Sequence, residues 1–173
     1  MANEKLPVSN AENSIVTRAV IIASFILTGI FIALLFFQDN LTGIFGRFAD
    51  ETTIGLMLFG LWIVVTSTVR SVNNLAKGVS AWKLITVGLL VGLVSAVLTT
   101  AFLLLFPTVA KSQNMAEVTG ATGAMILVIA ALALVIALIS IVNLRVKSRA
   151  LGNFLELLII GALIAIAIWR ATK

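Results

Sequence analysis

Long apolar runs separated by short polar segments make up most of the chain. The first run covers residues 15–37 and is interrupted only by Thr17, Arg18, Ser24 and Thr28. As an α-helix it spans roughly 34 Å, enough to cross a hydrocarbon core of about 30 Å. A signal peptide is the alternative, but the run is long for one and no small-residue cleavage motif follows it. The pattern therefore predicts a membrane-spanning helix.

Four further runs have the character of membrane-spanning helices. They cover residues 53–69, 82–106, 118–144 and 151–169. The last run could lie along the membrane surface, but residues 157–169 are apolar on all sides, which favours spanning. We therefore predict an all-α integral membrane protein with a bundle of five transmembrane helices. A four-helix bundle is the alternative.

The polar segments predict a simple domain organisation. Residues 1–14 are polar and predict a tail, and residues 15–173 form a single transmembrane domain. The segment between the first two runs carries apolar residues at helical spacing, namely Leu41, Ile44, Phe45 and Phe48. This spacing would give a short helix an apolar face, although an irregular loop is equally compatible with it.

The amino-acid composition is typical of a membrane protein and excludes several kinds of functional site. Hydrophobic residues make up 61% of the chain and charged residues 11%, and the mean hydropathy is +1.18. A soluble domain is about 45–50% apolar and about 25% charged. The chain contains no Cys, His or Tyr, which excludes disulfides, thiolate metal sites and histidine-based acid–base catalysis. We expect no enzymatic activity, no metal site and no cofactor.

The basic residues are divided unequally between the two sides of the predicted bundle. Eight fall on the side of the N-terminus, namely Lys5, Arg18, Arg70, Lys77, Lys83, Arg145, Lys147 and Arg149. Four fall on the opposite side, namely Arg47, Lys111, Arg170 and Lys173. The positive-inside rule then predicts a cytoplasmic N-terminus. We expect the cations from Arg70 to Lys83 and from Arg145 to Arg149 to contact lipid headgroups, and no nucleic acid.

Small residues recur at helical spacing in several of the runs. The predicted packing positions are Gly88, Gly92 and Ala96, then Ala133 with Ala137, and Gly161 with Ala165. The first run carries similar stripes, at Ala19 with Ala23 and at Gly29 with Ala33. In lipid, helices associate through close backbone approach, which small side chains permit. These stripes predict packing inside the chain's own bundle, which we favour, or against a partner subunit.

Glu156 is a carboxylate predicted to lie inside the last membrane helix. A charge at that position is costly and needs a partner or a purpose. The structural interpretation is an ion pair with Arg145, Arg149 or another loop cation. The functional interpretation is an ion or proton site. We favour the structural one, because the chain offers no His, no Tyr and no second embedded acid for a relay.

Motifs for catalysis are not recognisable in the chain. The segments GIFG and VTGATG contain glycines but lack the Lys-Ser/Thr of a phosphate-binding loop. A hydrolytic or metal site would have to use acids of the polar loops, namely Asp39, Asp50, Glu51 and Glu117. Hydroxyls could line a pore, namely Thr66, Ser67, Thr68, Thr99 and Thr100. In membrane helices such hydroxyls more often bond to the carbonyl four residues earlier.

One stretch resembles a known group of proteins. From Gly55 to Leu93 the chain reads as an apolar helix, the basic turn VRSVNNLAKGVSAWK and a Gly-rich helix. This arrangement resembles a bacterial family of small four-helix membrane proteins of unknown function. The matching positions are Arg70, Gly78, Lys83 and Gly88. The resemblance implies a bacterial inner membrane location and supplies no functional sites, and the extra final segment of this chain departs from the family pattern.

These observations predict a protein that catalyses no reaction. We expect a non-catalytic polytopic membrane subunit that packs, scaffolds or stabilises a larger membrane protein assembly. Its partners would be membrane lipids and other membrane subunits or copies of itself. The alternative is a small oligomeric channel or transporter that uses hydroxyl-lined helix faces or Glu156.

Overall fold

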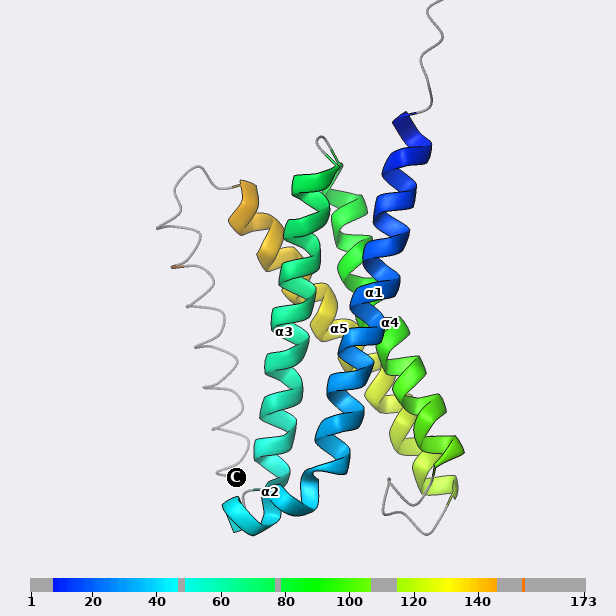
Figure 1. The fold of residues 1–173 in the computed structure, drawn as a ribbon, viewed down its shortest axis with the longest axis vertical. Coiled ribbons are helices and arrows are strands. Elements are labelled where there is room, and N and C mark those ends of the chain that lie inside the picture. The colour runs from blue at the N-terminus through cyan, green and yellow to red at the C-terminus, as the bar shows by residue number, and fades with distance from the viewer. Residues whose placement is uncertain (1–7, 47–48, 77–78, 107–114, 146–153, 155–173) are drawn as a thin grey trace, which may run out of the picture.

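The structure is a computed structural model, and it describes residues 8–46, 49–76, 79–106, 115–145 and 154. Within these ranges the regular secondary structure is entirely helical. The helices are α1 (Val8–Phe36), α2 (Gln38–Phe45), α3 (Ala49–Leu75), α4 (Ala81–Leu105) and α5 (Met115–Arg145) (Figure 1). Four of them, α1, α3, α4 and α5, are long and apolar enough to cross a membrane. The all-α class is therefore confirmed, with four helices that could cross a membrane, while the predicted span 151–169 lies outside the described residues.

Two helices extend beyond their apolar runs. Helix α1 begins at Val8, so residues 8–14, which were predicted to be part of a polar tail, are helical. Helix α3 begins before residue 53 and continues past Arg70 to Leu75. The apolar run marks the part that fits the membrane, whereas backbone hydrogen bonding continues into the polar flanks wherever no residue stops it.

Helix α4 lies within one residue of the predicted bounds 82–106 at each end, because both ends carry a local signal. Ser80 caps the first turn, and its hydroxyl oxygen accepts a hydrogen bond from the Lys83 backbone N–H at 3.3 Å. At the other end the helix stops at Leu105, ahead of Phe106 and the Pro107 that follows. A residue before proline is displaced from the helical conformation.

The connection between α1 and α3 contains the short helix α2, so the alternative of an irregular loop is wrong. Gly46 has a φ of 55° directly after this helix, a left-handed conformation that glycine adopts without strain and that commonly ends helices. Helix α2 packs mainly on α3. Its predicted apolar face is not fully covered, because Ile44 is 74% exposed.

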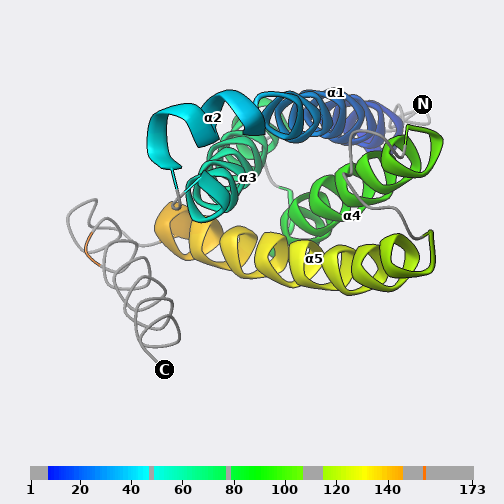
Figure 2. The same cartoon turned by 90° about the horizontal axis from the view of Figure 1, so that it is seen from below.

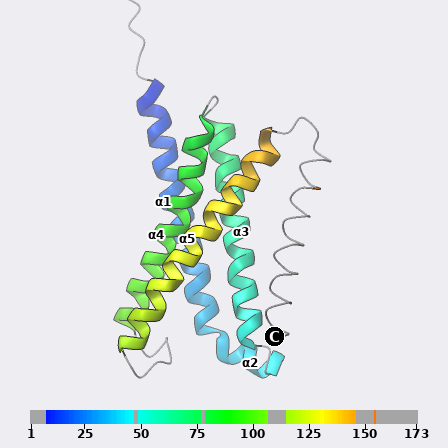
Figure 3. The same cartoon turned by 180° about the vertical axis from the view of Figure 1, so that it is seen from behind.

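The four long helices run alternately up and down in one bundle (Figure 1). The most extensive contact joins α4 to α5, followed by the contacts of α1 with α3 and with α4. Helices α1 and α5 lie on opposite sides of the bundle, with α3 and α4 between them (Figure 2). Seen from behind, α5 crosses obliquely over α3 and α4 (Figure 3). Helix α1 therefore presents an outward face that the other long helices do not cover.

Side chains from all four long helices meet in one apolar core. Its largest fully buried members are Leu27, Phe31, Leu61, Val65, Leu84 and Val91. Lipid tails are as apolar as these side chains, so their burial against each other is favoured by close packing and dispersion and not by escape from water.

The tightest part of this packing is the contact between α4 and α5. A Cβ atom added at Gly88 would overlap the Cβ of Ala137, and one added at Gly92 would overlap the Cβ of Ala133. All four residues are buried. The two backbones therefore approach as closely as they do only because two positions on α4 lack a side chain.

We predict that Gly92→Leu separates α4 from α5 and lowers the free energy of unfolding by at least about 3 kcal/mol, the upper range for an overpacked core. Leu90→Ala, on the 36% exposed side of the same helix, is expected to cost less than about 1 kcal/mol. Thermal unfolding in detergent, followed by circular dichroism, measures both. Gly29→Leu is the matched control, because a Cβ added at Gly29 meets nothing within 4 Å. Equal tolerance of Leu at positions 29 and 92 would contradict the assigned contact.

Candidate functional site

The interior polar groups between α1 and α4 centre on Ser95. Its hydroxyl lies 2.6 Å from the Val91 carbonyl oxygen of its own helix and 3.2 Å from the Ser24 carbonyl oxygen of α1. Since a serine hydroxyl carries one proton, Ser95 donates to one carbonyl at a time or shares the proton between them. The Ser95 carbonyl in turn accepts from Thr99 at 2.8 Å, and the Thr28 hydroxyl lies 3.5 Å from it. This cluster connects the two helices in the membrane interior.

Two interior hydroxyls do not take part in these hydrogen bonds. The Ser24 and Thr100 hydroxyl oxygens are buried and have no hydrogen-bond partner among the described residues. Ser24 is fully buried beside the Ser95 contact. An unpaired hydroxyl in an apolar interior costs roughly 1–3 kcal/mol, and Ser24 places such a group at the α1–α4 interface.

A second polar contact joins α3 to α5. The Ser140 hydroxyl donates to the Thr66 hydroxyl oxygen at 3.1 Å, and both residues are buried. Thr68 instead donates to the Val64 carbonyl oxygen of its own helix at 2.7 Å. Of the hydroxyls that the sequence offered as pore-lining candidates, Thr66 therefore joins two helices, whereas Thr68 and Thr99 bond to the carbonyl oxygen four residues earlier in their own helices.

The basic residues of the described helices gather at one end of the bundle, which we call the basic end. The N-termini of α1 and α4 and the C-termini of α3 and α5 lie there (Figure 1). These helix ends bring together Arg18, Arg70, Lys83 and Arg145. Three other predicted headgroup contacts, Lys77, Lys147 and Arg149, lie outside the described residues.

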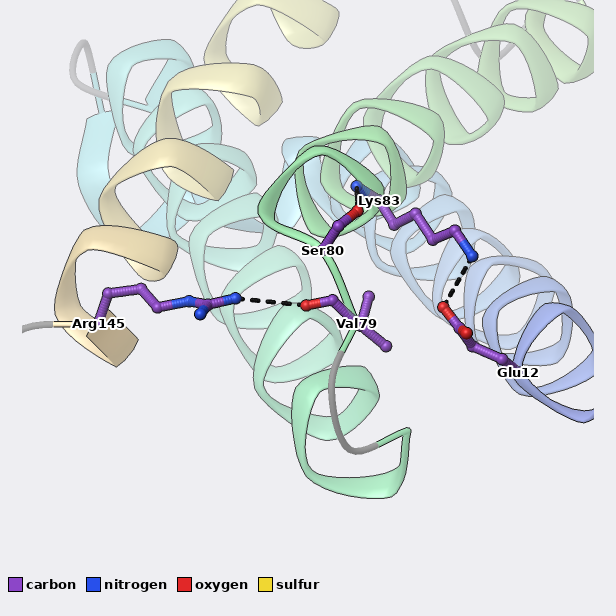
Figure 4. A network of polar contacts seen from close by, with 5 residues as sticks. All are labelled: Glu12, Val79, Ser80, Lys83 and Arg145. Carbon is purple, nitrogen blue, oxygen red and sulfur yellow. Dashed lines mark hydrogen bonds and ion pairs between the residues drawn. The ribbon is translucent and has the colours of Figure 1, made fainter. Parts of the chain in front are cut away.

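Two of these cations hold the basic end together (Figure 4). Lys83 forms an ion pair with Glu12 at 2.8 Å, which connects the start of α4 to the first turns of α1. Arg145 donates to the Val79 carbonyl oxygen at 3.3 Å, which connects the end of α5 to the segment before α4. Glu12 belongs to the stretch predicted to be a tail, and its helical placement is what lets it reach Lys83.

The predicted packing residues of the described helices lie inside the chain's own bundle. Gly88 and Gly92 contact Ala137 and Ala133, and Ala96 is fully buried. These positions are therefore occupied by intramolecular contacts and leave no room for a partner subunit. The remaining predicted positions, Gly161 and Ala165, and the embedded Glu156 lie outside the described residues.

The stripe of Gly29 and Ala33 on α1 has the opposite environment. Both residues are exposed, and a Cβ added at Gly29 meets nothing within 4 Å. Large side chains flank them, since Phe25 is 65%, Ile26 53% and Phe36 57% exposed. We call these five residues the outer lane of α1. The small residues lie at its centre and the large side chains at its edges, and a neighbouring transmembrane helix can pack closely on such a surface.

Next to this lane, α1 and α3 enclose a groove that opens on the surface of the bundle, with a volume of about 280 Å³. We call it the α1–α3 groove. Its walls include Ala19, Ala23 and Ile26 from α1 and Ile63, Ser67 and Ser71 from α3. Short side chains on both helices leave space that longer ones would fill, and the two serines are exposed.

Sequence reasoning identified the small-residue stripes but missed the groove and the Ser24–Ser95 contact. The signal for the contact was present, since hydroxyls recur four residues apart at positions 24 and 28 and again at 95 and 99. The pairing of the two helices was not readable from either run alone. Across the described residues, no three acidic side chains come together as metal ligands would.

We predict that Ser95→Ala weakens the α1–α4 interface and lowers the free energy of unfolding by about 0.6–1.7 kcal/mol, the range for interhelical hydrogen bonds in membranes. Thr86→Ala is the control, because the Thr86 hydroxyl bonds only to the Trp82 carbonyl oxygen of its own helix on the exposed side. Chemical unfolding in mixed micelles measures the difference. Equal losses in the two variants would show that Ser95 has no interhelical role.

Comparison with known proteins adds no further assignment. No family model, curated protein or solved structure matches this chain. The resemblance of residues 55–93 to the bacterial four-helix family stays a prediction. Any function must therefore be argued from the outer lane, the groove and the interior contacts themselves.

Proposed function

We propose that this protein is a non-catalytic polytopic membrane subunit that packs against other transmembrane helices and so scaffolds or stabilises a larger membrane protein assembly. The observation that carries the proposal is the outer lane of α1, where Gly29 and Ala33 are open at the bundle surface. Its partners are other membrane subunits or copies of itself.

The contrast between the glycines of α1 and α4 supports this role. Gly88 and Gly92 are covered by alanines of the same chain, whereas nothing in the described part of the chain approaches the Cβ position of Gly29. Glycine is poorer than alanine in helix propensity by about 1 kcal/mol. Its presence at an open position is explained if a helix of another polypeptide packs there.

The use of the interior polar groups supports a packing role as well. The hydroxyls of Ser95, Thr66 and Ser140 connect helices, and those of Thr68 and Thr99 bond to carbonyls within their own helices. The hydrogen bonds between helices stabilise one arrangement of the bundle. A bundle that keeps the small-residue face of α1 open is what a scaffold subunit requires.

We predict that a photoreactive amino acid at Phe25 crosslinks to another polypeptide in native membranes, and that Gly29→Leu abolishes the crosslink. The leucine would block close helix approach without disturbing the bundle, since position 29 is open. A probe at Val97, which is 47% exposed on α4, should crosslink to lipid alone. Mass spectrometry of the products identifies what is attached.

Gly123→Leu is the matched control, because Gly123 is an open glycine on α5, across the bundle from α1. It should leave the Phe25 crosslink unchanged. If Gly29→Leu and Gly123→Leu behave alike, or if Phe25 and Val97 give the same products, the outer lane is not an assembly surface.

The proposal includes an orientation and a location. The basic end faces the cytoplasm, since its cations outnumber those of the opposite side. The fifth apolar run, 151–169, crosses the membrane and places the C-terminus outside. The family resemblance over residues 55–93 supports a bacterial inner membrane.

Reporter fusions test this topology. A reporter after Lys77 is expected to be active as a cytoplasmic fusion, and one after Lys173 as an external fusion. A fusion within 38–48, which connects α1 and α3, provides an external control that does not depend on the last run. Cytoplasmic activity at both Lys77 and Lys173 would replace the five-span arrangement by the four-span alternative.

A small oligomeric channel or transporter is the second candidate. The unpartnered hydroxyl of Ser24 favours it, because a buried polar group at the α1–α4 interface is a possible contact for a permeating species. Glu156 would be the other candidate on such a path. Ion flux through proteoliposomes that contain only this chain, present in the parent and lost in Glu156→Gln, would support the transporter. Crosslinks only between copies of the chain would point the same way.

A further inference from the structure

The α1–α3 groove lies in the half of the bundle nearer the basic end. The two helices run in opposite directions and meet at the level of Ile30 and Gly60, where the Ile30 side chain fills the space beside the glycine. From there towards the basic end, the groove passes Ile26 and Ile63 and reaches Ala19 and Ser71. It therefore begins among apolar side chains and ends at the level of the charged residues.

We infer that this groove binds one anionic phospholipid, with an acyl chain along the groove and the phosphate between Arg18 and Arg70. The two arginines directly precede Ala19 and Ser71, the lining residues at the basic end of the groove. Both arginines are exposed. The inference goes beyond the proposed function, because it does not depend on Gly29, Ala33 or any protein partner.

The charges at the mouth fit a phosphate. An arginine guanidinium presents paired N–H donors that match phosphate oxygens. The described residues supply Arg18 with no hydrogen bond or ion pair. In contrast, Lys83 is held by Glu12 and Arg145 by the Val79 carbonyl oxygen.

The groove walls fit the rest of a lipid molecule. The buried Ala23 and Val64 provide an apolar floor for an acyl chain, and the exposed Ile26 and Ile63 provide its sides. Ser67 is an exposed hydroxyl one turn deeper than Arg70, at the depth where the ester groups of a phospholipid accept hydrogen bonds, and the exposed Ser71 lies at the level of the arginines. A volume of about 280 Å³ lies just below the range of about 300–1,000 Å³ for small-molecule pockets, which suits a chain that lies in an open furrow.

An anionic lipid explains the charge better than a partner helix does. Basic pockets between transmembrane helices recognise acidic lipid headgroups, which lie at the depth of the arginines. A helix in the same groove would cover the Arg18 guanidinium group and would need to supply a carboxylate to compensate for its lost hydration. A lipid phosphate provides that partner at the membrane surface.

Native mass spectrometry of the purified full chain tests the inference. The probes are phosphatidylglycerol and phosphatidylcholine with identical acyl chains, added in equal amounts. We expect the chain to retain one phosphatidylglycerol in preference to phosphatidylcholine by about tenfold, equivalent to about 1.4 kcal/mol. Equal retention of the two lipids by the unmodified chain would overturn the inference without recourse to any variant.

Three variants locate the bound lipid. The double variant Arg18→Gln with Arg70→Gln should lose the preference, since both headgroup contacts are gone. Ser67→Phe should reduce retention of phosphatidylglycerol while keeping every charge, since the ring fills the groove. Arg145→Gln removes a cation from the same end but away from the groove, and should keep the preference. Circular dichroism and elution volume verify that each variant is folded.

The outcomes separate a groove from a diffuse charge effect. If the arginine double variant loses the preference but Ser67→Phe retains it, the lipid associates with the charged surface only and the groove is not its site. If Arg145→Gln loses as much as the double variant, the same conclusion follows. A polypeptide that crosslinks to a probe at Ile63 in place of lipid would assign the groove to a protein.

Discussion

The close approach of α4 and α5 is the constraint on which the rest of the bundle depends. In lipid, apolar side chains gain nothing by leaving the solvent, so helices stay together through contact at short range. Gly88 and Gly92 provide that contact against Ala137 and Ala133. Once α4 is held against α5, its opposite side is available to α1, and Ser95 adds a polar contact there. Helix α3 then fills the space between α1 and α5.

The kind of polar side chain in this bundle depends on its depth. Neutral hydroxyls occupy the interior, where their short side chains bond to backbone carbonyls or to each other. Charged groups lie towards the two ends of the bundle, and at the basic end Lys83 meets Glu12 and Arg145 meets a carbonyl group. This division follows from cost, because an ion in hydrocarbon is far more expensive than a hydroxyl. The interior contacts specify the helix pairs, and the contacts at the basic end align them.

Helix α1 carries both surface features from which a function can be argued, at different depths. Gly29 and Ala33 of the outer lane lie further from the basic end than the α1–α3 groove, and the two features share Ile26. A protein helix on the lane and a lipid in the groove would therefore occupy neighbouring parts of one face. A lipid bound in the groove would enlarge the apolar surface of α1 that a partner helix contacts.

The sequence by itself determined the all-α class, the four helices long and apolar enough to cross a membrane, and the clustering of cations at one end. Each follows from local hydropathy and from the alternating direction of successive helices. Only the tertiary structure distinguished Gly92, which is covered, from Gly29, which is open. The two glycines have similar surroundings in the sequence. Burial depends on which helix lies opposite, and that pairing is a property of the whole bundle. The same holds for the Ser24–Ser95 contact and the groove, since each is made by two segments that are distant in the chain.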